Sequence, residues 1–239
     1  MFADLGTIGL MSSEIVLVVM AMFIYVVGAF YPKSKAWPGV ACATYLATIL
    51  FVLNYEWKLV SLYQSQEGFS GALIIDPLGQ FIRVISVPMG LLFTLMIWRR
   101  NDGELSSERL GTLMLAVVGV MLVGRANELT LMFLGLEMVS IPTYVLLYLG
   151  RRDRATAEAT VKYFFLSILS SALLLYGLSF LYGLSGTTVI AGSPKMPGIR
   201  EVLSGVVSVN STDHMAPLAT IGFVLIFAAL GFKIAAVQI

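Results

Sequence analysis

The stretch LMFLGLEMVSIPTYVLLYLG, residues 131–150, is an almost unbroken apolar run that contains one carboxylate, Glu137. Its length matches the roughly 20 residues that an α-helix needs to cross about 30 Å of hydrocarbon. An ionisable side chain near the centre of such a helix costs roughly 2.5–3.5 kcal/mol on insertion scales. The run therefore predicts a transmembrane helix, and Glu137 is a candidate functional residue within it.

The composition of the whole chain is that of an integral membrane protein. Of its 239 residues, 58 % are hydrophobic and only 12 % are charged. A water-soluble all-α protein is disfavoured, because several apolar stretches are long enough to span a bilayer. The net charge of +1 is too small for the basic surface that binds nucleic acid, so we expect no nucleic-acid partner.

Hydropathy, with breaks at Pro, Gly and charged residues, divides the chain into seven apolar segments. They lack the alternation of polar and apolar residues that is typical of membrane β-barrels. We therefore predict an all-α, polytopic transmembrane bundle of about seven helices. The expected helices cover about residues 15–31, 38–57, 78–98, 109–124, 129–149, 156–182 and 217–239, and GIREVLSGVV (198–207) is expected to form a short surface helix.

The basic residues of alternate connections predict the orientation, because Lys and Arg near membrane ends are retained on the cytoplasmic side. One set of connections has eight basic residues: Lys33, Lys35, Arg99, Arg100, Arg109, Arg151, Arg152 and Arg154. The other set has Arg125, Lys195 and Arg200, or four residues when Lys58 is added. The N-terminus is therefore predicted to lie outside. Because no Lys or Arg precedes the first apolar run, we expect that helix to be retained rather than cleaved as a signal peptide.

Two more ionisable residues, Lys162 and Lys233, lie within expected helices. Such residues usually face the interior of a bundle and mark proton or ion pathways. If Asp153 caps the sixth helix, Lys162 and Glu137 lie at similar depths, which would permit a direct or water-bridged contact. The alternatives are that each lysine snorkels to the headgroups and that Glu137 makes a helix–helix hydrogen bond.

The other notable residues are interpreted as structural. Arg83 and Arg125 lie near predicted helix ends and are expected to be interfacial or structural. Pro142 is expected to kink the fifth helix beside Glu137. Cys42, the single cysteine, reads as a small core residue, and His214, the single histidine, as an interfacial one. We predict neither a metal site nor a bound cofactor.

Three stretches resemble the antiporter-like N subunit of respiratory complex I, the proton-pumping NADH:quinone oxidoreductase. They are ANELTLMFLGLEMVSIPTYVLLYL (126–149), ATAEATVKYFFLSILSSALLLYGLSFLYG (155–183) and IGFVLIFAALGFKIAAV (221–237). The resemblance runs from about Arg125 to Val237, and the motifs E-M-x-S-I-P, V-K-Y-F and G-F-K occur in that order. We accordingly divide the chain into N-terminal helices 1–4 (1–124) and the start of an antiporter-like proton-translocation module (125–239).

The resemblance implies that Glu137, Lys162 and Lys233 take part in proton translocation, with Lys233 at a broken seventh helix. It implies a membrane subunit that holds no redox cofactor and works with other complex I subunits, the lipid bilayer and protons. The bacterial plasma membrane is the expected location.

Members of that family carry a second, inverted set of helices, so the chain is expected to be truncated within the seventh helix at AAVQI (235–239). A fragment, a truncated reading frame and one half of a split subunit all fit this expectation. Two other functions remain open. One is a subunit of a multi-subunit cation/proton antiporter, and the other is a seven-helix receptor or scaffold whose buried charges only fix helix packing.

Overall fold

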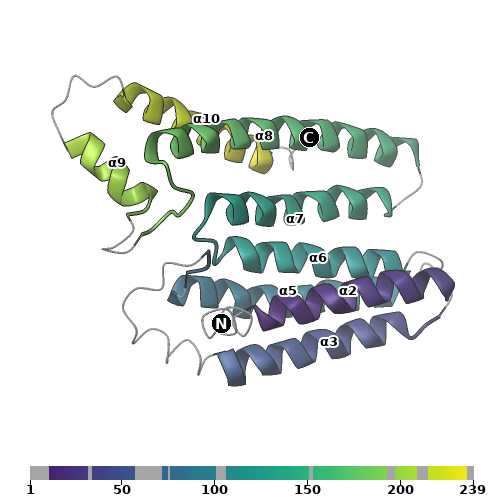
Figure 1. The fold of residues 1–239 in the computed structure, drawn as a ribbon. Helices are drawn as coiled ribbons and strands as arrows, with labels where there is room; N and C mark the ends of the chain where they lie inside the picture. The colour runs from purple at the N-terminus through teal and green to yellow at the C-terminus, as the bar shows by residue number, and fades with distance from the viewer. Residues whose placement is uncertain are drawn as a thin grey trace.

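Long helices that run side by side make up the protein (Figure 1). The structure is a computed structural model, and it describes residues 11–31, 34–56, 72–74, 76–100, 106–150, 153–192, 197–208 and 215–235. Seven helices within these ranges are long and apolar enough to cross a membrane. The predicted all-α transmembrane fold is confirmed.

The seven spanning helices fall on the seven predicted segments, and the short surface helix is present as well. The elements are α2 (Ser12–Phe30), α3 (Trp37–Phe51) with its π-helical continuation η1 (Val52–Glu56), α5 (Pro77–Arg100), α6 (Ser106–Val123), α7 (Leu129–Tyr148), α8 (Arg154–Ser185), α9 (Ile199–Ser208) and α10 (Met215–Ala235).

Local sequence signals explain the ends of α8, the longest described helix. Asp153 caps its start by accepting a hydrogen bond of 2.7 Å from the Thr156 N–H. Gly186 ends it in the left-handed conformation, at φ 69°, which a residue without a Cβ adopts at little cost. Helix α7 contains Pro142, and it runs as one continuous α-helix through this residue.

Two hydrophobic cores lie along the bundle. The first is formed by α2, α3, α5 and α6 and includes Leu17, Tyr45 and Met114, and the second is formed by α7, α8, α9 and α10 and includes Leu174. Helices α6 and α7 join the two cores through close glycine packing. A Cβ on Gly119 of α6 would meet α7 backbone atoms at 2.7–2.9 Å, so this interface requires a residue without a side chain.

Loops at one end of the bundle bind to one another and tie the two cores together. Isolated β-bridges pair Leu73 with Ala126 and Glu128 with Val189. The start of α9 joins the same network, because the Ile199 N–H donates to the Val189 carbonyl at 2.8 Å. We call the segments 72–74, 125–128, 187–192 and 198–201 the loop cap.

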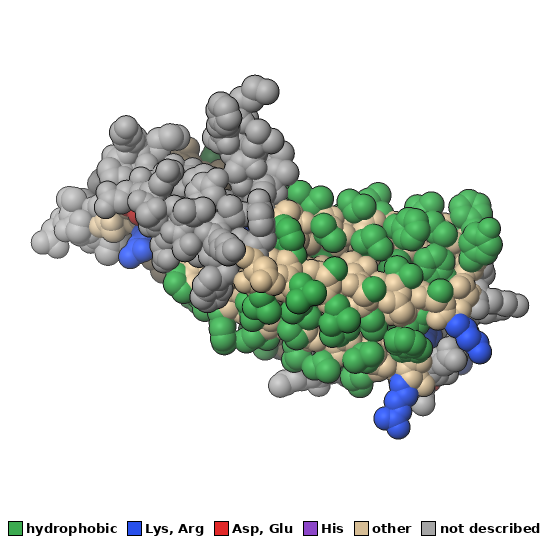
Figure 2. All heavy atoms as spheres, turned by 90° about the horizontal axis from the view of Figure 1, so that it is seen from below, with side chains coloured by type: hydrophobic (Ala, Val, Ile, Leu, Met, Phe, Trp, Pro, Cys, Tyr) green, Lys and Arg blue, Asp and Glu red, His purple; other side chains and the backbone are tan. Residues whose placement is uncertain are grey.

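The outer surface of the bundle is apolar. Figure 2 shows hydrophobic side chains across most of the face in view, with Lys and Arg towards its ends. Large apolar residues such as Phe30, Phe165 and Phe227 are exposed by 65–76 %. A soluble monomer rarely exposes so extensive an apolar patch, whereas lipid or a neighbouring membrane helix covers it without cost. The chain is an integral, multi-pass membrane protein.

Candidate functional site

Glu137 and Lys233 form an ion pair between α7 and α10. The Nζ of Lys233 lies 2.9 Å from Oε1 of Glu137, although the residues are 96 positions apart in the sequence. The side chains are mostly withdrawn from the surface, with exposures of 22 % for Glu137 and 13 % for Lys233. Glu137 lies roughly 12 Å along α7 from its start, at 1.5 Å per residue, which places the pair well inside the span.

Two serine hydroxyls complete the hydrogen bonding of this ion pair. Ser171 of α8 donates to Oε1 of Glu137 at 2.5 Å. The Nζ of Lys233 donates to Oγ of Ser140 at 3.1 Å, and Ser140 in turn donates to the Leu136 carbonyl at 2.9 Å. Three helices therefore supply one hydrogen-bonded unit, which we call the Glu137–Lys233 site.

Close packing of α10 on α8 brings Lys233 to the site. A Cβ on Gly177 of α8 would lie 2.7 Å from Cγ1 of Ile226 and 2.9 Å from the Gly222 carbonyl oxygen. One turn before Lys233, the Ala229 carbonyl accepts a hydrogen bond of 2.7 Å from Ser170 of α8. These contacts fix the distance between the two helices, and thereby the reach of the lysine.

The Glu137–Lys233 site can exchange a proton without changing its net charge. Transfer of one proton from Nζ to Oε1 converts an ammonium and a carboxylate into an amine and a carboxylic acid. Burial favours the neutral forms, whereas close contact between opposite charges favours the ionised forms. Because the attraction in a medium of low polarity changes steeply with separation, a small movement of α10 or the entry of water can decide which forms prevail.

The structure does not bring Lys162 to this site. The Nζ of Lys162 lies 2.7 Å from Oε1 of Glu158, one turn earlier on the same helix, and both side chains are more than 60 % exposed. Similar depth along two helices does not determine which face each residue occupies. The expected break in the seventh helix is also not observed within the described residues, because α10 is continuous and has Lys233 in its last turn.

A second buried ionic cluster lies among the first four helices and was not predicted. Glu14 of α2 accepts a hydrogen bond of 2.9 Å from Nη2 of Arg83 on α5, which also contacts the Ser13 hydroxyl. Nη1 of Arg125, in the loop cap, lies 4.0 Å from the other oxygen of Glu14. Gln80 accepts a hydrogen bond of 3.3 Å from Nη1 of Arg83.

Arg83 and Arg125 were predicted to be interfacial or structural, and the structure favours the structural alternative, because it buries both beside Glu14. Relative exposures are 0 % for Arg83, 2 % for Arg125 and 3 % for Glu14. These residues do lie near helix ends, but the loop cap covers that end of the bundle. The sequence did contain a signal: Arg83 stands in the apolar stretch FIRVIS, and Glu14 directly precedes the first apolar run. Glu14 and Arg83 stand out as candidates once ionisable residues near helix ends count as much as those near helix centres.

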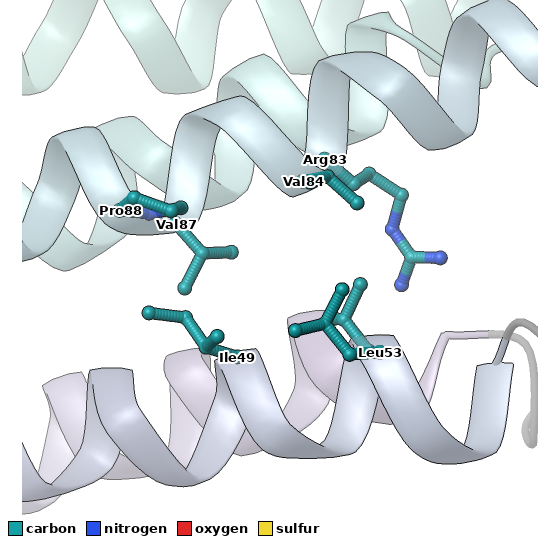
Figure 3. Close-up of a pocket in the computed structure, with 7 residues that line it drawn as sticks. Ile49, Leu53, Arg83, Val84, Val87 and Pro88 are labelled. Atoms are coloured by element: carbon teal, nitrogen blue, oxygen red, sulfur yellow. The ribbon is translucent and has the colours of Figure 1, made fainter.

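An apolar cavity of about 80 Å³ lies beside Arg83, between α5 and the end of α3 with η1 (Figure 3). Its other lining residues are Ile49, Val52, Leu53, Val84, Val87 and Pro88. The Arg83 guanidinium lies 2.9 Å from the Glu14 carboxylate. Within the described parts of the chain, no group of three His, Cys, Asp or Glu residues is placed to hold a metal ion. His214 lies outside the described residues.

Comparison with known families identifies the segment that carries the Glu137–Lys233 site. Residues 126–239 match the family described as "NADH:quinone oxidoreductase/Mrp antiporter, TM". This segment is similar to that antiporter-like family. The match includes Glu137, Lys162 and Lys233, and the resemblance to the antiporter-like N subunit of complex I is confirmed.

Relatives of the antiporter-like family match nearly the whole chain. The F(420)H(2) dehydrogenase subunit N of Methanosarcina mazei is 32 % identical over 232 residues, which cover 95 % of this chain and 44 % of the relative. The NADH-quinone oxidoreductase subunit N of Azorhizobium caulinodans is 29 % identical, and the match covers 98 % of this chain and 45 % of that relative. The NAD(P)H-quinone oxidoreductase subunit 2 of a Synechococcus species is 30 % identical, with 97 % and 41 % covered. The chain thus spans less than half the length of these curated relatives.

Solved structures show the same fold for the first helices as well as for the matched segment. A chain of respiratory complex I from Thermus thermophilus with bound aureothin superposes with a TM-score of 0.66 at 21 % identity, with 93 % of this chain and 44 % of that chain covered. A chain of the membrane-bound sulfane sulfur reductase, an archaeal respiratory membrane complex, gives 0.72 at 17 % identity, with 95 % and 44 % covered.

Proposed function

We propose that this chain is a membrane subunit, or part of one, of a proton-translocating NADH:quinone oxidoreductase, and that Glu137 and Lys233 exchange a proton during its cycle. The observation that carries the proposal is the 2.9 Å contact between Nζ of Lys233 and Oε1 of Glu137 inside an apolar bundle. An intramembrane ion pair of this kind is a default site for proton movement. The relatives named as NADH-quinone oxidoreductase subunits support the choice of complex.

The chain contributes proton-carrying side chains, and electron transfer takes place on other subunits. Quinone reduction elsewhere in the complex would change the charge and hydration next to Glu137 and Lys233. As the pair separates, one proton passes from Nζ of Lys233 to Oε1 of Glu137 and leaves both side chains neutral. Glu137 then releases this proton to water on one side, and Lys233 takes up a proton from water on the other. Lys162 is proposed as a further translocation residue, because it lies in the matched segment and its ammonium already contacts a carboxylate, Glu158.

The proposed setting follows from the same assignment. Residues 1–124 would form the four N-terminal helices, and residues 125–239 would begin the proton-translocation module. The partners would be other membrane subunits of complex I, lipid and protons. The proposed location is a bacterial plasma membrane, with the N-terminus outside.

A multi-subunit cation/proton antiporter is the second candidate, because the description of the matched family includes Mrp antiporters. Sodium-dependent transport in vesicles without NADH would favour it. If the charges of Glu137 and Lys162 served only for packing, apolar replacement of both residues together would leave the activity of the assembly intact.

Co-migration and a charge substitution together test the proposal. The tagged chain, solubilised gently from its own membrane, is expected to migrate on native gels with a large NADH-oxidising assembly. Glu137→Gln should then lower NADH-driven proton translocation at least tenfold without loss of assembly, whereas Glu201→Gln, at an exposed position of α9 outside the Glu137–Lys233 site, should not. Normal proton translocation by Glu137→Gln would overturn the role of this residue, and failure to co-migrate would overturn the assignment to the complex.

A further inference from the structure

Two consecutive serines of α8 bind two different helices. Ser170 donates to the Ala229 carbonyl of α10, and Ser171 donates to the Glu137 carboxylate of α7. Ser170 is fully buried. Helix α8 thus holds α10 on one side and the acidic side chain of α7 on the other, at the depth where Lys233 reaches Glu137.

This pattern differs from that of most hydroxyls in the described spans. Ser and Thr side chains in membrane helices commonly donate to the carbonyl four residues earlier, which satisfies the hydroxyl within its own helix. Nine hydroxyls of the described helices do so: Thr44, Thr48, Ser86, Thr94, Thr112, Ser140, Thr143, Thr160 and Ser185. Ser171 instead donates across a helix interface to a charged acceptor, and hydrogen bonds to charged groups are about twice as strong as neutral ones.

Ser140 holds the other half of the pair. Its hydroxyl donates to the Leu136 carbonyl, as an ordinary helical serine does, and so directs an acceptor lone pair away from the helix. The Lys233 ammonium donates to this lone pair at 3.1 Å. Ser140 is 7 % exposed, so water does not readily replace it.

We propose that Ser171 and Ser140 are positioning residues of the Glu137–Lys233 site: Ser171 fixes the carboxylate and Ser140 fixes the ammonium, so that proton donor and acceptor stay in contact between α7 and α10. The inference rests on the proposed function. Oε1 of Glu137 receives both the Ser171 hydroxyl and the Lys233 ammonium, so rotation of the carboxylate away from Lys233 breaks the serine bond as well. The two serines therefore favour the state in which Lys233 and Glu137 are in contact, and they determine how readily these two side chains separate.

Substitution of Ser171 in the full chain, within its membrane assembly, tests the inference. Ser171→Ala is expected to lower the proton-translocation rate roughly tenfold, the effect of losing one hydrogen bond to a charged group. Ser171→Thr should restore most of the rate, because its hydroxyl can take the same rotamer. Ser179→Ala is the matched control on α8, since the exposed Ser179 only donates to the Tyr176 carbonyl of its own helix.

A double substitution and a spectroscopic signature separate positioning from packing. In a Glu137→Gln background, Ser171→Ala should cause no further loss of rate, and Ser140→Ala should likewise add nothing to Lys233→Met. Infrared difference spectra should show the Glu137 carboxylate band, identified by its loss in Glu137→Gln, shifted in Ser171→Ala and restored in Ser171→Thr.

Three outcomes overturn the inference: an unchanged rate and band in Ser171→Ala, additive losses in the double variants, or no recovery by threonine. A shifted band together with normal translocation by Glu137→Gln would support the positioning role while overturning the proposed function.

Discussion

At the scale of single residues, the Glu14 carboxylate forms a buried ionic cluster with two arginines. It faces Arg83 and Arg125, and all three side chains are at least 96 % withdrawn from the surface. Removing one partner of a buried ion pair typically costs 3–5 kcal/mol, because the remaining charge is left without compensation. We expect Glu14→Gln to destabilise the protein by about this amount, measured by thermal unfolding in detergent.

A second substitution tests whether the loss comes from the uncompensated charge. Arg83→Met removes the guanidinium closest to Glu14, and combining it with Glu14→Gln should cost less than the sum of the two single changes. Strict additivity would show that Glu14 and Arg83 contribute independently, contrary to their 2.9 Å contact.

At the scale of elements, the interface of α8 with α10 requires a glycine at position 177. The added Cβ of Gly177→Ala would lie 2.9 Å from the Gly222 carbonyl, which is backbone and cannot rotate away. Overpacking of this kind costs about 1–3 kcal/mol. We expect a lower melting temperature for Gly177→Ala and an unchanged or higher one for Gly183→Ala, because nothing lies within 4 Å of a Cβ at Gly183 on the same helix. Equal melting temperatures for the two variants would contradict this packing.

The start of α9 depends on an ionised carboxylate. Oε2 of Glu201 accepts hydrogen bonds from the N–H groups of Gly192 at 3.0 Å and Gly198 at 2.8 Å. These bonds, that from Gly192 foremost, lower the pKa of Glu201 below its ordinary value of 4.5. Their contribution to stability is therefore complete above about pH 4.5 and is lost as the pH falls through the lowered pKa.

Amide hydrogen exchange measures this contribution at Gly192 and Gly198. Both amides should be protected at neutral pH and, after correction for the intrinsic rate, should lose protection in acid. Glu201→Gln should abolish the pH dependence, whereas protection that persists in acid in the wild type would rule out a role for the carboxylate.

At the scale of the whole molecule, the sequence determined the helices far better than their pairing. Hydropathy located all seven spans, because helix length and apolarity are local properties. It also singled out Glu137 and Lys233, since an ionisable residue stands out in an apolar run. That Lys233, rather than Lys162, meets Glu137 depends on the rotation and packing of α8 and α10, which Gly177 and Ser170 fix through contacts distant in sequence. Glu14 and Arg83 were missed because hydropathy cannot show that loops cover a helix end.

The folded structure strengthens the prediction of the bundle's orientation in the membrane. Lys35, Arg99 and Arg154 are exposed at one end, whereas Arg125, assigned to the opposite end, is 2 % exposed and faces Glu14. Arg125 is therefore not a free loop charge, and the bias in basic residues is steeper than the sequence count of eight against three suggests. The end that carries Lys35 should face the cytoplasm.

Single-cysteine labelling in sealed vesicles of known orientation tests this expectation. In a Cys42→Ala background, Ala36→Cys and Ser204→Cys place exposed thiols at opposite ends of the bundle without removing a basic residue. A membrane-impermeant maleimide should label position 204 in right-side-out vesicles and position 36 in inverted ones. The reverse pattern would put the loop cap and Glu14 on the cytoplasmic side. Labelling of both positions from one side would contradict the odd number of spans that separates them, because α3, α5, α6, α7 and α8 all lie between residues 36 and 204.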